Sequence, residues 1–467
     1  MITEYALAVD IGTSSVRAMI YTSDGIMIPD SLAQRHYSSV LTSDGGAVFD
    51  PLQLREQIFS CIDDALQLPT TMSCNIRAVG IDTFATNLLG VNAAGIPLTP
   101  VYLWNDTRSR RYTTQLALDA DDHYDRTGTA LHSSYWPSRF LWLKATQPDI
   151  WPRVARWLSL GEWLQESIFG ITRCSTSLAA WTGLLNRRTG IWDEGTLLAC
   201  DVDIDRLAEI SDRPFGLLPD RFAKRWPLLR QAEWHAALSD GYTANVGSGA
   251  VTPDRAALTI GTSGALRVLV PGVPDHVPHG LFCYKVNVSQ SLIGGAVSNA
   301  GNVFAWLQQT LKITGDPFDN VDDLTLPNAH GLIVHPSWAG ERSPGWHDDA
   351  SAMISGMTLN TTADDIARAA LEAVLYQVAA VDDLLCASLN HKPTIFAAGG
   401  VLASSPGWGQ VTADILGRDV QLCADSQASA RGTALLALGS YAEPIIVSTY
   451  ATRPPFTAIY HASRTGL

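Results

Sequence analysis

One short pattern occurs twice in the sequence: an apolar stretch, then Ile-Gly-Thr-Ser, then a second apolar stretch. The first copy spans residues 8–21 and the second spans residues 257–270. Short apolar runs on either side of a glycine and small hydroxyl residues predict β-hairpins with polar tips. Because one copy stands near the start of each half of the chain, the repeat predicts two related lobes that meet over one ligand.

The tip of the first hairpin has the chemistry of a phosphate site. Gly12 allows the backbone to approach a ligand closely, and Thr13 and Ser14 add hydroxyl donors beside free N–H groups. Asp10 stands at the mouth of this nest, where a carboxylate needs a divalent cation, Mg²⁺ with its waters, between itself and a polyphosphate. In the second copy Thr259 replaces the aspartate, so the metal is expected beside the first lobe. The alternative is a pair of ordinary hairpins whose polar groups satisfy turn backbone.

A mixed aromatic and polar stretch, residues 104–108, follows the apolar residues 101–103 and suits a polyol. The indole of Trp104 offers a face to C–H groups, while Asn105 and Asp106 offer directional partners to hydroxyls. The structural alternative is that Asn105 or Asp106 caps the basic helix that follows.

Two further stretches are candidate walls of a substrate pocket. Residues 82–87 follow a predicted strand over residues 76–81, and residues 132–137 form a polar and aromatic loop in a region rich in tryptophan. Most of the tryptophans are expected to fill the core, because large rings at irregular spacing usually do. His132 fits a core histidine as well as a ligand contact, and the sequence leaves open whether His132 and Tyr135 reach the pocket.

Length and charge restrict the class of protein. A chain of 467 residues exceeds one hydrophobic core, so two domains are expected, residues 1–246 and 247–467, with a small and flexible boundary at residues 241–249. A formal net charge of −14 argues against general affinity for nucleic acid or anionic membranes.

The cysteines and the hydropathy pattern point to a cytoplasmic protein. The 7 cysteines are scattered and form no Cys-x-x-Cys pair, so free thiols in a reducing compartment are expected. The sequence starts directly with a predicted strand, without an export signal, and contains no apolar run long enough to span a bilayer.

Taken together, these motifs resemble the FGGY family of carbohydrate kinases, within the sugar kinase, hsp70 and actin superfamily. The resemblance runs from about Tyr5 to about Leu438. Besides the two hairpins and residues 103–108, it rests on Ser239-Asp240-Gly241, on residues 340–344 and on residues 398–400. The resemblance implies an α/β fold with two actin-like (ribonuclease H-like) lobes, each a mixed β-sheet flanked by helices, and an active site in the cleft between them.

The resemblance also implies a reaction and a set of residues. In these kinases ATP, with Mg²⁺, phosphorylates a hydroxyl of a sugar, a sugar acid or a polyol, and an Asp of an Asp-Gly pair is the base, here Asp240. The structural alternative for Asp240 is a turn or a helix cap. The residues expected to bind the acceptor are Thr86, Asn87, Trp104, Asn105, Asp106, Tyr135 and Asp240. The residues expected to bind the nucleotide are Gly12, Thr13, Ser14, Arg17, Gly261, Thr262, Ser263, Gly301, Gly399, Gly400 and Ser404, with Asp10 holding Mg²⁺ through water.

The acceptor is the least determined part. Gluconate kinases of the family resemble this chain most, in residues 258–267, 280–284 and 293–302, so D-gluconate to 6-phosphogluconate is the leading expectation. Xylulose kinases and many gluconate kinases carry a Met-His or Trp-His pair where this chain has Ala85 and Thr86, and losing the imidazole removes a positive charge that would favour a sugar acid. Xylulose or another ketose or polyol therefore stays open as the acceptor, and a nucleotide-binding regulator without a sugar substrate stays open as another class. A homodimer stays open as the assembly.

Overall fold

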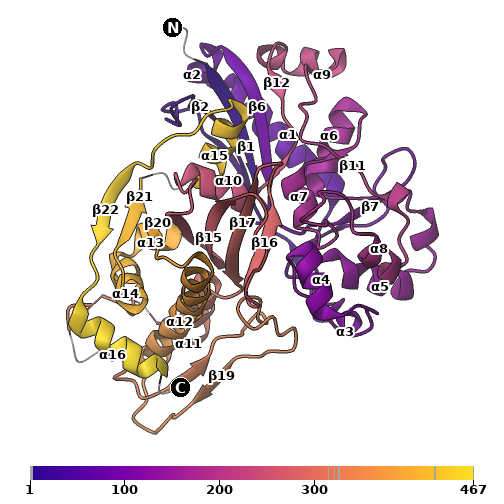
Figure 1. Ribbon diagram of the computed structural model, residues 1–467. Coiled ribbons are helices and arrows are strands. Elements are labelled where there is room, and N and C mark those ends of the chain that lie inside the picture. The colour runs from indigo at the N-terminus through magenta and orange to yellow at the C-terminus, as the bar shows by residue number, and fades with distance from the viewer. Residues whose placement is uncertain (1–3, 314, 320, 324–326, 425–426, 466–467) are drawn as a thin grey trace.

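The computed structural model describes residues 4–313, 315–319, 321–323, 327–424 and 427–465, and shows two α/β lobes side by side (Figure 1). The strands of the first half are β1 Tyr5–Ile11, β2 Ser15–Thr22, β3 Ala33–His36, β4 Val40–Leu41, β5 Ala47–Phe49, β6 Ile76–Thr83, β7 Leu89–Val91, β8 Val101–Tyr102, β9 Arg156–Leu158, β10 Arg173–Cys174, β11 Glu209–Ile210, β12 Glu233–Trp234 and β13 Leu238–Ser239. Its helices are α1 Pro51–Gln67, α2 Pro69–Met72, α3 Arg110–Thr113, α4 Ala120–Thr127, α5 Trp136–Thr146, α6 Leu160–Phe169, α7 Thr176–Ala180, α8 Glu194–Cys200, α9 Asp220–Arg225 and α10 Asp240–Gly247, with 3₁₀ turns at Trp151–Arg153, Ile204–Arg206 and Pro227–Leu229.

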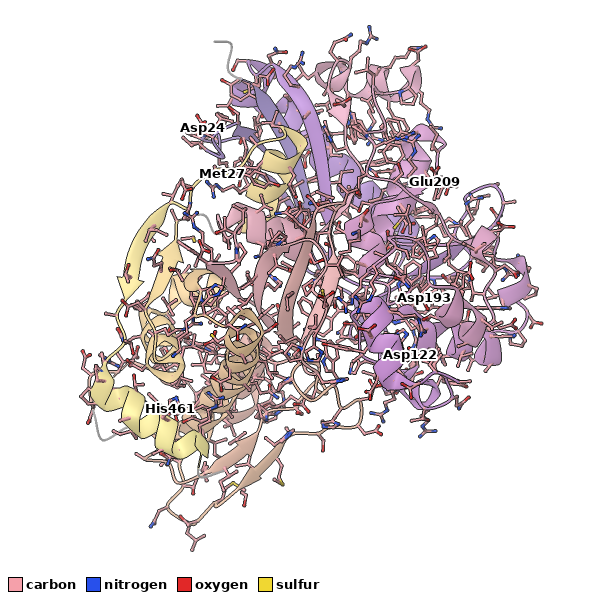
Figure 2. All side chains as sticks on the ribbon, viewed as in Figure 1. Asp24, Met27, Asp122, Asp193, Glu209 and His461 are labelled. Carbon is pink, nitrogen blue, oxygen red and sulfur yellow. The ribbon has the colours of Figure 1, made fainter. Side chains whose placement is uncertain are left out.

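The second half continues the same alternation. Its strands are β14 Arg255–Ile260, β15 Gly264–Pro271, β16 Phe282–Lys285, β17 Gln290–Val297, β18 Ile333–His335, β19 Met353–Ser355, β20 Thr394–Ala398, β21 Val420–Cys423 and β22 Ile446–Tyr450. Its helices are α11 Gly301–Leu311, α12 Ala363–Leu389, α13 Gly400–Ser404, α14 Pro406–Leu416, α15 Ala428–Ala437 and α16 Pro454–Thr465. In the side-chain view, Asp24 marks the turn after β2 in the upper part and His461 marks α16 in the lower part (Figure 2).

The two central sheets repeat one topology. The first has the order β12-β6-β1-β2-β3 with β13 also pairing with β6, and the second has the order β16-β17-β15-β14-β20-β21-β22. In both sheets the hairpin strands pair antiparallel, and the first hairpin strand pairs parallel with the strand that follows the crossover. The sequence repeat therefore reports a structural repeat, as expected.

Residues at the N-terminal ends of two long helices explain where these helices begin. Helix α1 begins after Asp50, whose side chain accepts a hydrogen bond from the Gln53 N–H, and has Pro51 in its first turn. Helix α12 begins with a capping box between Thr362 and Asp365. The basic helix is different, because α3 is a single turn whose N-cap residue is Ser109, so neither Asn105 nor Asp106 caps it.

The flexibility expected near the domain boundary is wrong for residues 241–247. Residues 240–247 form helix α10, which is buried after its first residue, with Ser239 at the N-cap position and Asp240 as the first helical residue. The glycines serve close packing instead. A Cβ atom on Gly247 would lie 1.8 Å from the Ala428 carbonyl oxygen, and one on Gly432 would lie 1.8 Å from the Thr243 carbonyl oxygen. Helices α10 and α15 thus cross with their backbones in contact, which larger residues would prevent.

Helix α15 belongs to the second half of the chain but packs on the first sheet, against β1, β2 and β6. Ala430, Ala434 and Ala437 form a buried apolar cluster with residues of the first sheet such as Ala8 and Met19. The expected division of the chain into two domains at residue 246 remains a prediction. Helix α15 follows that residue in the sequence but packs on the first lobe.

Two other expectations concern the whole chain. The seven cysteines all lie in the described part of the chain, and none of them forms a disulfide. Among the helices of the described residues, none combines the length and the hydropathy needed to cross a membrane.

Candidate active site

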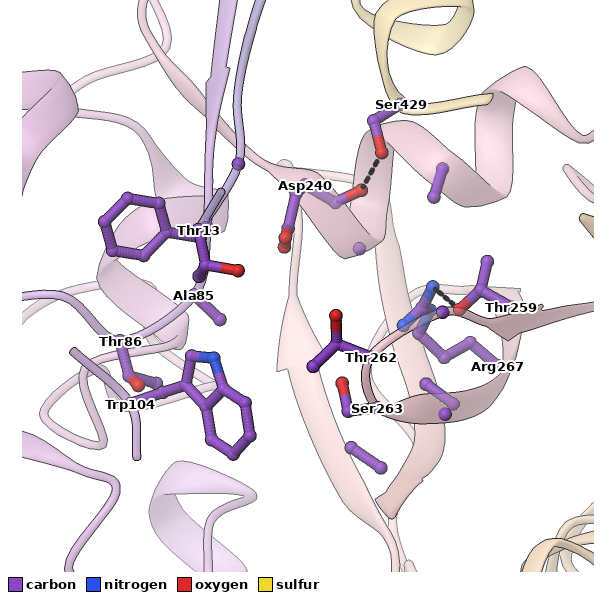
Figure 3. Close-up of a pocket in the computed structure, with 18 of the residues that line it drawn as sticks. Thr13, Ala85, Thr86, Trp104, Asp240, Thr259, Thr262, Ser263, Arg267 and Ser429 are labelled. Carbon is purple, nitrogen blue, oxygen red and sulfur yellow. Dashed lines mark hydrogen bonds between the residues drawn. The ribbon is translucent and has the colours of Figure 1, made fainter. Parts of the chain in front are cut away.

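A cavity of about 330 Å³ lies between the two lobes, where the tips of both hairpins meet. Of the residues predicted to bind ligands, those that line it are Asp10, Gly12, Thr13, Ser14, Arg17, Thr86, Trp104, Tyr135, Asp240, Gly261, Thr262, Ser263 and Gly399. The fold therefore brings together residues from widely separated parts of the sequence. Figure 3 shows Trp104 and Thr13 on one side of the cavity, Thr262 and Ser263 on the other, and Asp240 between the two groups.

The first hairpin presents an acidic group to the cavity. The Arg17 guanidinium donates a hydrogen bond of 3.2 Å from Nη1 to Oδ2 of Asp10. The parallel register of β1 and β6 places Asp82 beside Asp10, and the Asp82 carboxylate accepts a 2.6 Å hydrogen bond from the Thr433 hydroxyl of α15. Burial raises the pKa of Asp10, and burial followed by the charge of Asp10 raises the pKa of Asp82 well above its usual value.

The second hairpin is held by glycines behind its tip. A Cβ atom on Gly301 would lie 2.6 Å from the Gly261 carbonyl oxygen, and the Gly301 N–H donates to that oxygen at 2.9 Å. Gly399 has a φ of 122°, and a Cβ atom there would lie 2.3 Å from the Ile260 carbonyl oxygen. Both positions need glycine because backbone passes close to backbone, and this contact fixes the hairpin tip in the cavity.

Asp240 is a half-buried carboxylate that lines the cavity. It is the first residue of α10, where the N-terminal end of the helix favours a negative charge. Burial raises its pKa to about 6, against the opposing effect of the Arg267 charge. At neutral pH the group is thus mostly ionised yet basic enough to accept a proton from a hydroxyl.

The acceptor side of the cavity is aromatic. Trp104 has the Arg342 guanidinium over its ring, with Cζ 4.3 Å from the ring centroid. The rings of Tyr135 and Trp346 lie 5.8 Å apart between centroids. Thr86 lines the cavity with a φ of 48°, and its carbonyl accepts a 2.7 Å hydrogen bond from buried Arg139. Flat apolar faces with few polar groups between them suit a sugar chain.

Several predicted residues do not line the cavity. Asn87 is buried, with its side-chain oxygen accepting from the Leu160 N–H at 2.5 Å and its amide donating to the Phe84 carbonyl. Asp106 is also buried, and its carboxylate accepts from the Ala47 N–H and from Arg108. These hydrogen bonds give both residues structural roles, and their contact with substrate remains a prediction. Asn105, Gly301, Gly400 and Ser404 also lie outside the lining, and Ser404 is exposed.

His132 lies behind the cavity wall. Its Nε2 lies 3.1 Å from the Glu341 carbonyl oxygen and 3.1 Å from Oδ1 of Asp348, both from the second lobe. Asp348 also accepts hydrogen bonds from the backbone N–H of Ser133 and from the Thr113 hydroxyl. Residues 341–348 therefore reach across to the first lobe, and His132 acts in that contact.

Among the lining residues that sequence reasoning did not predict are Trp181, Arg267, Arg342 and Trp346. Arg267 and Arg342 stand inside the motifs that carried the family resemblance, but a motif does not tell where a side chain points. One signal was available: an arginine inside an otherwise apolar predicted strand, as Arg267 is, needs a buried partner.

The donor set fits a magnesium ion that arrives with the nucleotide. Within the described ranges, no three His, Cys, Asp or Glu residues form a group that could hold a metal by themselves. Asp10, supported by Asp82, instead offers carboxylate oxygen beside the phosphate-binding tip, and phosphate oxygens and water would complete the coordination of Mg²⁺.

The comparisons with known proteins agree with this geometry. The gluconokinase of Bacillus licheniformis is 27% identical over 453 residues, covering 93% of this chain and 87% of that protein, and the gluconokinase of Bacillus subtilis (strain 168) is 26% identical over 455 residues with the same coverage. The structure of a xylulose kinase from Lactobacillus acidophilus superposes with a TM-score of 0.89 at 25% identity, covering 99% of this chain and 96% of that one.

A gluconate kinase structure from the same organism superposes with a TM-score of 0.88 at 24% identity and the same coverage, which shows the shared fold. The description of the FGGY carbohydrate kinase N-terminal domain matches residues 5–247, and that of the C-terminal domain matches residues 256–441. The chain therefore belongs to the FGGY family of carbohydrate kinases.

Proposed function

We propose that this protein transfers the γ-phosphoryl group of Mg-ATP to a hydroxyl of D-gluconate, giving 6-phosphogluconate. The observation that carries the proposal is the position of Asp240, a half-buried carboxylate with a pKa of about 6, between the two phosphate-binding tips and the aromatic acceptor wall. The gluconokinases of the two Bacillus species support gluconate as the acceptor.

The residues of the chain divide the reaction among them. Asp240 accepts the proton of the attacking hydroxyl, so that the oxygen can form its bond to phosphorus as the bond to ADP breaks. Backbone N–H groups and hydroxyls at Gly12–Ser14 and Gly261–Ser263 hold the phosphates from the two lobes. Mg²⁺, when bound beside Asp10, neutralises charge on the phosphate oxygens.

The lining of the cleft favours transfer of the phosphoryl group to the acceptor over its transfer to water. The aromatic rings on the acceptor side exclude solvent from the neighbourhood of the transferred group, and closure of the lobes limits hydrolysis of ATP. An intact base and a shaped acceptor wall also argue against a regulator that only binds nucleotide. These features fit a metabolic enzyme of the cytoplasm.

A neutral ketose is the second candidate. The xylulose kinase named above has a similar overall structure, and Thr86 contributes a neutral, buried hydroxyl to the cavity in place of the imidazole that relatives carry there.

The test is ADP release by the purified protein with Mg-ATP, over a panel of gluconate, other aldonates, ketopentoses, ketohexoses, glycerol and pentitols. We expect gluconate to raise the rate far above the ATPase background. A faster rate with xylulose would identify xylulose, instead of gluconate, as the acceptor. If no member of the panel raised the rate of ADP release, this result would contradict the kinase assignment.

A further inference from the structure

Two arginines, buried Arg267 and half-buried Arg342, line the cavity, and their side-chain hydrogen bonds go to neutral groups. Arg267 donates from Nε to the Asn245 side-chain oxygen at 3.3 Å and from Nη2 to the Thr259 hydroxyl at 3.0 Å. Arg342 donates from Nε to the Ser298 hydroxyl at 3.3 Å and from Nη2 to the Val297 carbonyl at 3.2 Å. Neither forms an ion pair within the described part of the chain. Because a guanidinium has five N–H donors, each retains donors for a ligand.

A buried charge is costly unless an opposite charge balances it, and Asp240, a single carboxylate, is the acidic group whose charge acts on both arginines. Burial, opposed by Asp240 and assisted by the charge of Arg342, lowers the pKa of Arg267 to about 10, so Arg267 stays charged at neutral pH, and burial also lowers the pKa of Arg342. The protein has 46 acidic residues from which partners could have been drawn. The missing negative charge is therefore best supplied by a ligand.

The surroundings of the two arginines belong to the acceptor side. Arg342 stacks on Trp104, and Tyr284, which is hydrogen-bonded to Tyr135, lies close enough to affect the pKa of both arginines. The phosphates have donors of their own at the hairpin tips. An anionic group on the acceptor, rather than on the nucleotide, fits this position.

Gly241 makes room for Arg267 beside the base. A Cβ atom at residue 241 would lie 3.3 Å from Nη1 of Arg267 and 2.6 Å from the indole of Trp181. A larger residue directly after Asp240 would push the guanidinium away from the cavity. Figure 3 shows Asp240 with Trp104 to one side and Arg267 to the other.

We propose that Arg267 and Arg342 bind the carboxylate of a sugar-acid acceptor and so select sugar acids over neutral sugars. The proposal rests on the proposed kinase function and names the residues that recognise its substrate class. It also resolves the difficulty raised by Ala85 and Thr86, because the positive charge comes from the second lobe instead of from an imidazole on the first.

The experiment compares D-gluconate with D-gluconamide, which keeps the carbon chain and the hydroxyls but carries no charge. We expect the wild-type protein to have a much higher kcat/KM for gluconate. In Arg267→Gln and Arg342→Gln, the KM for gluconate should rise by about 10- to 100-fold with a smaller change in kcat, because charge-assisted hydrogen bonds are lost. Measured at a pH well above the pKa of Asp240, where a shift of that pKa has little effect on the rate, the kcat/KM for gluconamide should change by less than about threefold.

Two further variants control for structural damage. Arg342→Lys keeps the charge and should recover part of the affinity for gluconate. Arg255→Gln removes an arginine from the second hairpin, which also carries Arg267, at the end far from the cavity. Arg255 pairs there with Glu443, so the kcat/KM for both acceptors should stay unchanged.

Three results would overturn the proposal. Equal use of gluconate and gluconamide by the wild type would leave a carbohydrate kinase without carboxylate recognition. An equal loss of kcat with both acceptors in the arginine variants would assign the arginines to the transferred phosphoryl group. If the wild type phosphorylates neither acceptor, the kinase proposal fails separately, and gluconate titrations followed by tryptophan fluorescence still decide: affinity that is the same in wild type and Arg267→Gln contradicts carboxylate binding.

Discussion

The hydroxyl oxygen of Tyr135 lies 2.6 Å from the hydroxyl oxygen of Tyr284, so a side chain of the first lobe is hydrogen-bonded directly to one of the second lobe. Both residues are buried, and both line the acceptor side of the cavity. This hydrogen bond holds the two walls of the acceptor pocket together and forms only when the lobes are close.

Removing this bond should weaken acceptor binding. In Tyr135→Phe the ring remains and the hydroxyl is lost, so we expect the KM for the acceptor to rise by about 2- to 10-fold, the range for one hydrogen bond, while the KM for ATP stays unchanged. Steady-state kinetics with each substrate varied in turn measure both values. Tyr112→Phe, outside the cavity, serves as the control, and an unchanged acceptor KM would show that the bond does not hold the pocket.

Replacing the base should separate binding from transfer. We expect Asp240→Asn to bind ATP normally in a calorimetric titration and to lose phosphoryl transfer by about 100-fold or more. The exposed Asp121→Asn is the matched control. Near-normal turnover of Asp240→Asn would remove this residue from the role of base.

The same variant should be more stable than the wild type at pH 8. The pKa of Asp240 in the folded protein, about 6, is raised above its usual value, so the ionised carboxylate destabilises the fold above that pH. Removing the charge should raise the free energy of unfolding by about 1–3 kcal/mol, and the gain should shrink as the pH falls through 6. Denaturant titrations at pH 5 and pH 8 measure the difference, and an equal change at both would contradict it.

Activity should depend on pH through the same group. A base must be ionised to accept a proton, so kcat/KM for the acceptor should fall about tenfold for each pH unit below about 6 and level off above 7. Since the charge of Arg267 lowers the pKa of Asp240, Arg267→Gln should move this limb to higher pH. The affinity for ATP, measured over the same pH range, corrects for protonation of the nucleotide itself. A profile that is flat from pH 5 to pH 8 would exclude a titrating base in this range.

The second hairpin should not tolerate a side chain behind its tip. In Gly301→Ala the new methyl group would meet the Gly261 carbonyl at 2.6 Å, a backbone contact that only movement of the hairpin can relieve. We expect the KM for ATP to rise about tenfold or more while the acceptor KM changes little, because the displaced tip holds phosphate. An unchanged KM for ATP would show that phosphate binding at the hairpin tip does not require glycine at residue 301.

Local patterns predicted the parts of the fold that depend on neighbouring residues. Short-range signals specify both hairpins and the capped helices α1 and α12. They also specify the position of Asp240, which lies between the two hairpins in the chain. Residues 241–249 were misread because small residues suit both a flexible link and a close helix crossing, and only the partner, Gly432, distinguishes the two.

The candidate site was predictable where a motif carries backbone function, as at Gly12 and Gly261, and less so where a side chain has alternatives. Asp106 looks like a substrate ligand, but Arg108 and the Ala47 N–H take up its carboxylate, and Ala47 is remote in the sequence. Arg267 and Arg342 reach the cavity through strand register and a loop from the second lobe, which no local pattern specifies.

The packing of α15 on β1, β2 and β6 has a consequence for how the chain acquires its structure. The first strands to leave the ribosome bury one face under residues 428–437, which are made near the end of synthesis. Until then Ala8 and Met19 have no cover, and one face of the sheet that carries Asp10 is exposed. The nascent first lobe must therefore wait for almost the whole chain to cover this face, so a product truncated before residue 428 would expose the apolar face behind Asp10 and would not accumulate as an idle half-enzyme that consumes ATP.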